Sequence, residues 1–330
     1  MTLTQLRYLV AIADAGLNIT LAAERVHATQ PGLSKQLKQL EDELGFRLFA
    51  RRGKSLEAVT PAGSQVLERA RNMLAEATSI RAIAANLRSD DRGELRIATT
   101  HTQARFALPS AITALNLRYP RVSVHIQPEH DAGVLAQLDS GRADLAVIST
   151  AGAPPPGIAL PAYRWHRVIV APTGHPLATR TQPATLVELA ALPLVSYDSS
   201  LKPESSLLRA FEVAGLRPHI AMTAGDADLI KTYVRAGLGV GVLAEMAMLP
   251  ADQADLHTLP ADHLFPQCTT WIVLSREGVL RDFVLDFIHQ FAPQLERREI
   301  ARTFTGAGPK RWPPAPHWRD RQPAGVSAPA

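Results

Sequence analysis

The sequence A-A-E-R-V-H-A-T-Q-P-G-L-S-K-Q-L-K-Q-L-E-D-E-L, residues 22–44, decides the fold of the N-terminal part of the chain. A short helix over residues 20–26 ends at the turn H-A-T-Q, and Thr29 is then the expected N-cap of a new helix with Pro31 in its first turn. Apolar residues at helical spacing, which stop at Gly16, predict one more helix before these two. The expected order is therefore helix, tight turn, helix.

The helix that follows Thr29 has an apolar face and a polar face. Leu33, Leu37 and Leu40 share one side, and lysines with short polar residues occupy the other. A DNA recognition helix needs this pattern. Its apolar face packs on the rest of the domain, while its lysines contact phosphates and its Gln or Ser side chains contact base edges. The alternative is a solvated amphipathic helix. The expected DNA contacts are Thr29, Gln30, Pro31, Ser34, Lys35 and Lys38.

A basic hairpin is expected directly after this helix. Two short apolar segments flank Arg51, Arg52, Gly53 and Lys54, and a turn between two strands explains the glycine. The three cations at such a tip would contact backbone phosphate or the minor groove rather than read base sequence. Residues 1–60 therefore read as a winged helix-turn-helix domain.

Residues 61–92 predict a long linker helix that runs from Ser64 to about Arg88 without helix breakers. Two sets of small or apolar residues recur every seven positions and form one seam. We interpret this seam as a dimerisation surface, because a small DNA-binding domain gains specificity when a dimer contacts two half-sites of the DNA. The alternative is a helix packed on its own domain. The two sets are Val66, Met73, Ile80 and Leu87, and Ala70, Ala77 and Ala84.

Residues 93–296 alternate between strand and helix patterns, which predicts an α/β domain with parallel sheets. A second set of strands and helices begins near Leu186, so we expect two lobes with a ligand cleft at the strand ends between them. The last segment, residues 297–330, is rich in Pro and Gly, and we expect it to be a disordered tail.

The sequence T-T-H-T-Q-A-R, residues 99–105, predicts an anion site where a strand meets a helix. Free backbone N–H groups at a helix start, together with hydroxyl and amide donors, hold sulfate, phosphate or carboxylate without a full counter-charge. An ordinary threonine N-cap is the alternative interpretation.

Composition excludes several classes of protein. With 330 residues and 46% apolar positions the chain can bury more than one core, and no apolar run is long enough to span a bilayer. No basic-then-apolar leader opens it, so we expect a cytoplasmic protein without membrane contact. The net charge of +4 is poor support for DNA binding, since seven Lys or Arg and two Asp or Glu lie in residues 297–330. No catalytic, metal or cofactor motif is found, so no enzyme is expected.

The N-terminal sequence A-A-E-R-V-H-A-T-Q-P-G-L-S-K-Q-L-K-Q-L-E-D-E-L-G-F-R-L-F-A-R, followed by V-T-P-A-G, resembles the LysR-type transcriptional regulators. The stretches T-T-H-T-Q-A-R, R-Y-P-R-V-S-V-H and G-D-A-D-L-I-K-T-Y-V-R resemble the CysB branch, which controls sulfur assimilation. The resemblance implies periplasmic-binding-protein-like lobes and a homotetramer built from dimers paired through the linker helix. Its implied partners are double-stranded promoter DNA, RNA polymerase as a candidate, and sulfate, thiosulfate, O-acetylserine, N-acetylserine or adenosine phosphosulfate as effector.

The anion site of this branch maps by motif onto Thr100, Thr102 and Gln103. Ser149 stands where the branch usually has threonine, so a hydroxyl is retained. Lys202 stands near a threonine that helps hold the anion in the relatives. If its ammonium enters the cleft, the site would favour a more anionic effector over a zwitterionic acetylserine, whereas a surface lysine is the alternative.

Two more positions fall near the expected cleft. Trp165 lines it or packs between the lobes, and Asp226 at an acidic helix start is expected to cap that helix rather than to bind an ammonium group. The favoured function is regulation of cysteine biosynthesis genes. The alternatives are regulation of sulfonate use, a LysR-type regulator with an unrelated effector, a solute receptor and an enzyme, and the absence of a leader and of a nucleophile–base set argues against the last two.

Overall fold

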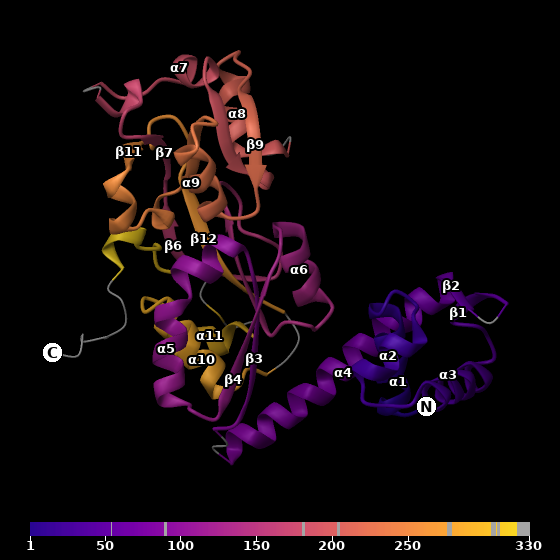
Figure 1. Cartoon of the computed structure of the whole chain (residues 1–330). Helices are drawn as coiled ribbons and strands as arrows, with labels where there is room; N and C mark the ends of the chain where they lie inside the picture. The colour runs from indigo at the N-terminus through magenta and orange to yellow at the C-terminus, as the bar shows by residue number, and fades with distance from the viewer. Residues whose placement is uncertain are drawn as a thin grey trace. The chain divides into compact units, whose positions relative to one another are not determined.

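The computed structural model describes residues 1–53, 55–88, 91–179, 182–202, 205–275, 279–304, 308 and 311–321. The chain divides into two compact units. One comprises residues 1–90 with 277–281, and the other comprises residues 91–276 with 282–330. Figure 1 shows the whole chain, with the N-terminal unit in indigo and purple.

The N-terminal unit has the predicted helix-turn-helix followed by a hairpin and a long helix. Threonine or asparagine side chains cap its four helices by accepting a backbone hydrogen bond: Thr2, Asn18, Thr29 and Thr60. The elements are α1 (Leu3–Asp14), α2 (Ile19–Arg25), α3 (Gln30–Leu44), β1 (Phe49–Arg52), β2 (Ser55–Val59) and α4 (Pro61–Leu87). The linker helix thus begins at Pro61 rather than at the expected Ser64, because Thr60 caps it and proline suits the first turn.

One apolar cluster holds this unit together. The leucines of the inner face of α3 are buried against α1, and the N-terminal part of α4 closes the cluster. Val66 and Ala70 of the predicted dimer seam belong to this core, whereas Met73, Ile80 and Leu87 are exposed. The seam is therefore divided: its first turns pack on their own domain, and its later turns present apolar side chains to solvent.

The first lobe of the second unit, lobe I, contains a five-stranded sheet with the order β4-β3-β5-β12-β6. Helix α6 covers β3 and β5, and α5 contacts α10. The sheet is mixed rather than parallel as expected, because β12 returns from the other lobe and pairs antiparallel with β5 and β6. Its elements are β3 (Gly93–Thr99), α5 (Pro109–Arg118), β4 (Val122–Pro128), α6 (Asp131–Asp139), β5 (Leu145–Thr150), β6 (Ile158–Trp165), β12 (Cys268–Leu274) and α10 (Asp282–Phe291).

Lobe II contains a second five-stranded sheet with the order β11-β7-β10-β8-β9, and α9 packs on it. The chain enters this lobe at His166, between β6 and β7, and leaves it between β11 and β12. This sheet is also mixed, since β7 pairs antiparallel with β10 and β11. Its elements are β7 (Arg167–Pro172), α7 (Leu186–Ala190), β8 (Pro193–Tyr197), α8 (Ser206–Val213), β9 (His219–Ala224), α9 (Ala227–Arg235), β10 (Val240–Ala244) and β11 (Leu256–Pro260).

The short helical turns complete the second unit. They are the π-helix η1 (Gln103–Ala107) and the 3-10 helices η2 (Pro176–Thr179), η3 (Asp198–Leu201), η4 (Glu245–Ala247), η5 (Pro250–Ala254) and η6 (Trp318–Asp320). Of these, η1 positions the candidate site, because it follows β3 directly and a π-helical turn rotates successive side chains differently from an α-helix.

The C-terminal segment differs from the expected disordered tail. Residues 297–303 form helix α11 (Arg297–Thr303), and residues 311–321 are hydrogen-bonded to lobe I through Arg164. Composition is misleading here because the Pro-rich segment supplies aromatic and arginine side chains that pack on the folded lobe instead of building a core of its own. Residues 305–307, 309, 310 and 322–330 lie outside the described part of the chain.

Candidate functional site

The outer face of α3 carries the predicted recognition residues. Pro31, Lys35 and Lys38 are exposed, while the leucines on the opposite face are buried. Thr29 accepts the backbone N–H of Gly32 at 3.3 Å, and the amide of Gln30 donates to Ser34 Oγ at 3.1 Å. The first turn therefore presents short polar groups with cations beyond them, as a recognition helix requires.

The hairpin β1–β2 supplies the wing. Arg51 and Arg52 lie on β1 and are exposed, and Lys54 lies outside the described residues. Arg51 Nη2 also forms an ion pair at 3.2 Å with Glu41 of α3, a residue that the sequence analysis did not single out. Part of the Arg51 charge is thus used inside the protein, which leaves Arg52 as the described wing cation without an internal ion pair.

Glu41 joins the recognition helix to the wing. Its buried carboxylate accepts hydrogen bonds from Arg47 Nη1 at 2.8 Å and from the backbone N–H of Leu48 at 2.9 Å. Burial alone would raise the pKa of Glu41, but these hydrogen bonds and Arg51 hold that pKa below its usual range. The sequence signal for this residue is its position beside Leu40 and one turn after Leu37, on the apolar face.

In lobe I, three of the predicted effector residues meet in one polar cluster. The Gln103 amide donates to Ser149 Oγ at 3.1 Å, and the Trp165 indole N–H donates to Ser149 Oγ at 3.3 Å. Thr270 of β12, which the sequence analysis missed, lies 2.8 Å from Ser149 Oγ and accepts from the Trp165 indole at 3.1 Å. The antiparallel return of β12 creates this cluster, since Thr270 pairs directly with Ser149 in the sheet register.

Tyr163 of β6 closes the cluster from the other side, and its hydroxyl donates to Gln103 Oε1. Burial raises the pKa of Tyr163 to about 12, so the phenol stays protonated and keeps its donor. Gln103, Trp165 and Thr270 are buried, whereas Ser149 and Thr100 are half-buried. The buried polar groups of this cluster therefore have hydrogen-bond partners within it. The hydroxyls of Ser149 and Thr100 are the more accessible groups nearby.

Thr102, the neighbour of Gln103, connects this polar cluster to lobe II. Its side chain lies beside the hydroxyl of Tyr197 at the end of β8, and the Tyr197 hydroxyl accepts the backbone N–H of Ala244 at 3.2 Å. Burial raises the pKa of Tyr197. Neighbouring residues Thr102 and Gln103 thus contact different lobes, so a ligand at this turn would be sensitive to the distance between the lobes.

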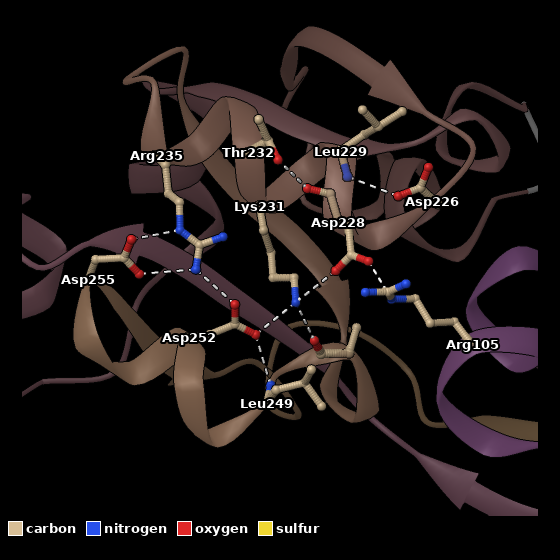
Figure 2. Close-up of polar contacts among 11 residues, drawn as sticks. Arg105, Asp226, Asp228, Leu229, Lys231, Thr232, Arg235, Leu249, Asp252 and Asp255 are labelled. Carbon is tan, nitrogen blue, oxygen red and sulfur yellow. Dashed lines mark hydrogen bonds and ion pairs between the residues drawn. The ribbon is translucent and has the colours of Figure 1, made fainter. Parts of the chain in front are cut away.

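An ion-pair network extends from the same turn into lobe II (Figure 2). Arg105 of η1 pairs with Asp228 of α9, and Asp228 also lies 3.1 Å from Lys231 Nζ. The Lys231 side chain is 3% exposed, and its ammonium donates to Asp252 at 2.7 Å and to the Ala247 carbonyl at 2.9 Å. A buried ammonium needs such partners, because an unpaired one is costly in a medium of low polarity.

The outer end of the network is Arg235, which binds Asp252 at 2.8 Å and Asp255 at 2.7 Å. Burial alone would raise the pKa of Asp252, but Lys231 and Arg235 hold it below its usual range. Asp226 accepts the backbone N–H of Leu229 at 2.9 Å and therefore caps α9, as expected from the sequence.

Lys202 stays apart from the cluster among the residues that the structure describes. It follows η3 in lobe II, its side chain is half-buried, and its carbonyl accepts the backbone N–H of Ser205 at 2.8 Å. The structure thus brings together Gln103, Ser149 and Trp165 and reaches lobe II through Thr102. Among the described residues, the Lys202 side chain forms no hydrogen bond or ion pair with this set.

Comparison with known proteins identifies the family. The sequence model of the family "LysR substrate binding domain" matches residues 88–296. The sequence model of the family "Bacterial regulatory helix-turn-helix protein, lysR family" matches residues 3–64. The chain belongs to the LysR family of transcriptional regulators. This LysR protein is therefore a DNA-binding regulator and not an enzyme, as expected.

Two similar proteins are the transcriptional regulator CysB of Haemophilus influenzae and the transcriptional regulator SsuR of Burkholderia cenocepacia. The first is 42% identical, over 92% of this chain and 93% of that protein, and the second is 38% identical, over 91% and 98%. The crystal structure of the cofactor-binding domain of the Cbl transcriptional regulator has a TM-score of 0.60 and 35% identity, covering 65% of this chain and 94% of that domain. The LysR protein thus groups with CysB, Cbl and SsuR.

The described residues lack a membrane-spanning helix and a metal-binding cluster. No helix among them is long and apolar enough to cross a membrane. No group of three or more His, Cys, Asp or Glu side chains in that part of the chain could hold a metal ion.

Proposed function

We propose that this protein regulates genes of sulfur assimilation and cysteine biosynthesis in response to a small anionic or acetylserine-type effector bound between its lobes. The observation that carries the proposal is the pair Thr102 and Gln103, which lie on one turn and contact opposite lobes. The likeness to CysB over 92% of the chain supports the sulfur assignment.

The effector site is built around the turn from Thr100 to Gln103. Its groups are neutral donors, because the nearby Arg105 guanidinium is paired with Asp228. Neutral N–H and O–H donors at a helix start hold an anion through dipoles rather than through a counter-charge. Such a site accepts sulfate, thiosulfate or the carboxylate of an acetylserine.

Effector binding would act by shifting the arrangement of the lobes. The contact between Thr102 and Tyr197 and the ion pair between Arg105 and Asp228 cross from one lobe to the other beside the site. A ligand that binds one lobe arrangement more tightly than another shifts the population toward it, and equal affinity would shift nothing. The paired DNA-binding domains would then change their spacing.

The DNA-binding arm consists of α3 and the wing. We propose that Thr29, Gln30, Pro31 and Ser34 face base edges while the lysines and wing arginines contact phosphates. The exposed side chains Met73, Ile80 and Leu87 of α4 support pairing of two linker helices, and the homotetramer and a contact with RNA polymerase belong to the same proposal.

Control of sulfonate use is the second candidate, and Lys202 favours it. The half-buried side chain of this lysine lies in lobe II, shortly after β8, and the last residue of β8, Tyr197, lies beside Thr102. An ammonium directed into the cleft would favour sulfate, a sulfonate or a phosphosulfate over a zwitterion. Lys202→Thr should then weaken the preferred anion markedly, and unchanged anion affinity would rule this role out.

Calorimetric titration of the full chain tests the proposal. The ligands are sulfate, thiosulfate, O-acetylserine, N-acetylserine and adenosine phosphosulfate, and the variants are Thr100→Ala and Thr102→Ala. Thr78→Ala is the matched control, because its exposed hydroxyl donates to the Leu74 carbonyl of its own helix, α4. Saturable binding that is lost in the two variants and kept in the control supports the proposal. Absence of binding by all five ligands contradicts the sulfur assignment.

A further inference from the structure

A cavity of about 920 Å³ lies at the edge of lobe I, away from the effector cluster. Strands β6 and β12 form one wall, and residues 311–315 of the C-terminal segment form another. Drug-sized ligand sites commonly measure roughly 300–1,000 Å³. The cavity is therefore large enough for a small organic molecule.

The cavity and the effector cluster lie on opposite faces of the same two strands. Successive side chains of a strand alternate between the faces of a sheet. Tyr163 and Thr270 face the Gln103 cluster, whereas their neighbours Arg164 and Trp271 line the cavity. Trp271 packs with the apolar cluster of α6, which confirms that it points to the other face. The cavity is thus separate from the effector site.

The C-terminal wall is anchored to both lobes. Arg164 donates its backbone N–H to the Pro316 carbonyl and its Nε to the Ala315 carbonyl, both at 2.8 Å. The buried Glu245 of lobe II pairs with His317 at 3.1 Å and with Arg319 at 2.8 Å. These contacts fix the segment along the edge strand β6.

Arg321 secures the end of the segment. Its guanidinium lies 4.4 Å from the ring centre of Tyr163, 4.8 Å from that of Phe291 and 5.0 Å from that of Trp318, and Nη2 donates to the Phe291 carbonyl at 2.8 Å. A cation held over three rings is favourable when it is shielded from water. The wall of the cavity is therefore a packed part of the fold.

The lining combines apolar surface with positive charge. Trp271 and Trp312 are half-buried, several prolines surround them, and Arg164 and Arg311 are exposed cations. No Asp or Glu lines the cavity among the described residues. Arg164 uses Nε for Ala315 and Nη1 for Gln267, which leaves further N–H donors of its five for an anion. The Trp271 indole N–H already donates to Thr150, so its ring contributes apolar surface.

We propose that this cavity binds a small organic anion with an aromatic body, of the aryl sulfonate or aryl carboxylate class. The tryptophans and prolines would cover the ring, and the two arginines would hold the anionic group through charge-assisted hydrogen bonds. The proposal does not depend on the identity of the interlobe effector. It assigns a second ligand site to the C-terminal segment.

Calorimetric titration of the full chain with naphthalene-1-sulfonate tests this site. We expect saturable binding of one molecule per chain. Arg311→Gln and Trp312→Ala should each weaken it by roughly tenfold, the effect of losing about 1.4 kcal/mol. Arg217→Gln is the matched control, because this exposed arginine of lobe II does not line the cavity. Arg311 is exposed, so its replacement should leave the fold intact.

Two comparison ligands and one further variant make the test decisive. Methanesulfonate lacks the ring and 1-naphthylmethanol lacks the charge, so both should bind at least tenfold more weakly than the probe. Thr102→Ala should leave probe binding unchanged. Loss of probe binding in Thr102→Ala would indicate that the probe binds at the interlobe site instead. The anion site would be refuted if the neutral alcohol bound as tightly as the probe, or if Arg311→Gln bound the probe as tightly as the unmodified protein.

Discussion

The guanidinium of Arg105 in lobe I forms an ion pair with the carboxylate of Asp228 in lobe II. Arg105 lies two residues after Gln103, and Asp228 lies in the first turn of α9 beside the buried Lys231. The pair therefore places a charge contact between the lobes next to the candidate effector site (Figure 2). Its partners are 58% and 34% exposed, so solvent screens their attraction.

A double-mutant cycle measures this contact. Arg105→Gln, Asp228→Asn and the double variant should give a coupling energy of at most about 1 kcal/mol, because the pair is partly exposed. All four tryptophans lie in the second unit, so tryptophan fluorescence during urea unfolding reports on that unit alone. A coupling energy of zero would mean that the contact contributes nothing in solution.

Asp252→Asn should destabilise the second unit by roughly 3–5 kcal/mol, because it removes a charge partner from a buried ammonium. Lys231 would keep the Ala247 carbonyl and the more distant Asp228. Asp255→Asn is the matched control: this carboxylate is 53% exposed and solvent screens its ion pair with Arg235, so its loss should destabilise the unit much less. The same fluorescence experiment compares them, and similar losses in both variants would contradict the buried network.

Glu41 should make the N-terminal unit sensitive to acid. Its pKa is lower in the folded protein than the ordinary value of 4.5, so its stabilising contribution is present above pH 4.5 and is lost as the pH falls through the folded pKa. Glu41→Gln should reduce this loss, as followed by helical circular dichroism. Glu57→Gln, an exposed residue of the wing, should keep the acid dependence of the unmodified protein.

Lys35→Ala and Lys38→Ala should weaken binding to promoter DNA and flatten its dependence on salt concentration. Each lost phosphate contact lowers the slope of log K against log salt by roughly one unit. Lys202→Ala is the control, because Lys202 lies in the second unit. Fluorescence anisotropy of labelled DNA over a range of salt concentrations gives the slopes. An unaltered slope would show that these lysines do not contact DNA phosphates.

Local signals predicted the N-terminal unit well. Thr29 and Pro31 mark the start of the recognition helix because capping and proline geometry act within a few residues of the chain. Thr60 and Pro61 carry the same signal, and they start the linker helix three residues before the predicted Ser64. The expected parallel pairing is confirmed for β4-β3-β5 and for β10-β8-β9, but both sheets are mixed, because the direction of the other strands depends on pairing partners far apart in the chain.

The sequence by itself determined the helix-turn-helix, the linker helix, the strand-to-helix turn at Thr100–Gln103 and the family resemblance. Only the tertiary structure decided that Thr270 and Tyr163 complete the Gln103 cluster, that Lys231 is buried among aspartates, and that the C-terminal segment packs on β6. The physical reason is the range of the interactions. Caps and helical faces arise between near neighbours, whereas these contacts join residues brought together by strand pairing and by the burial of charge and aromatic surface.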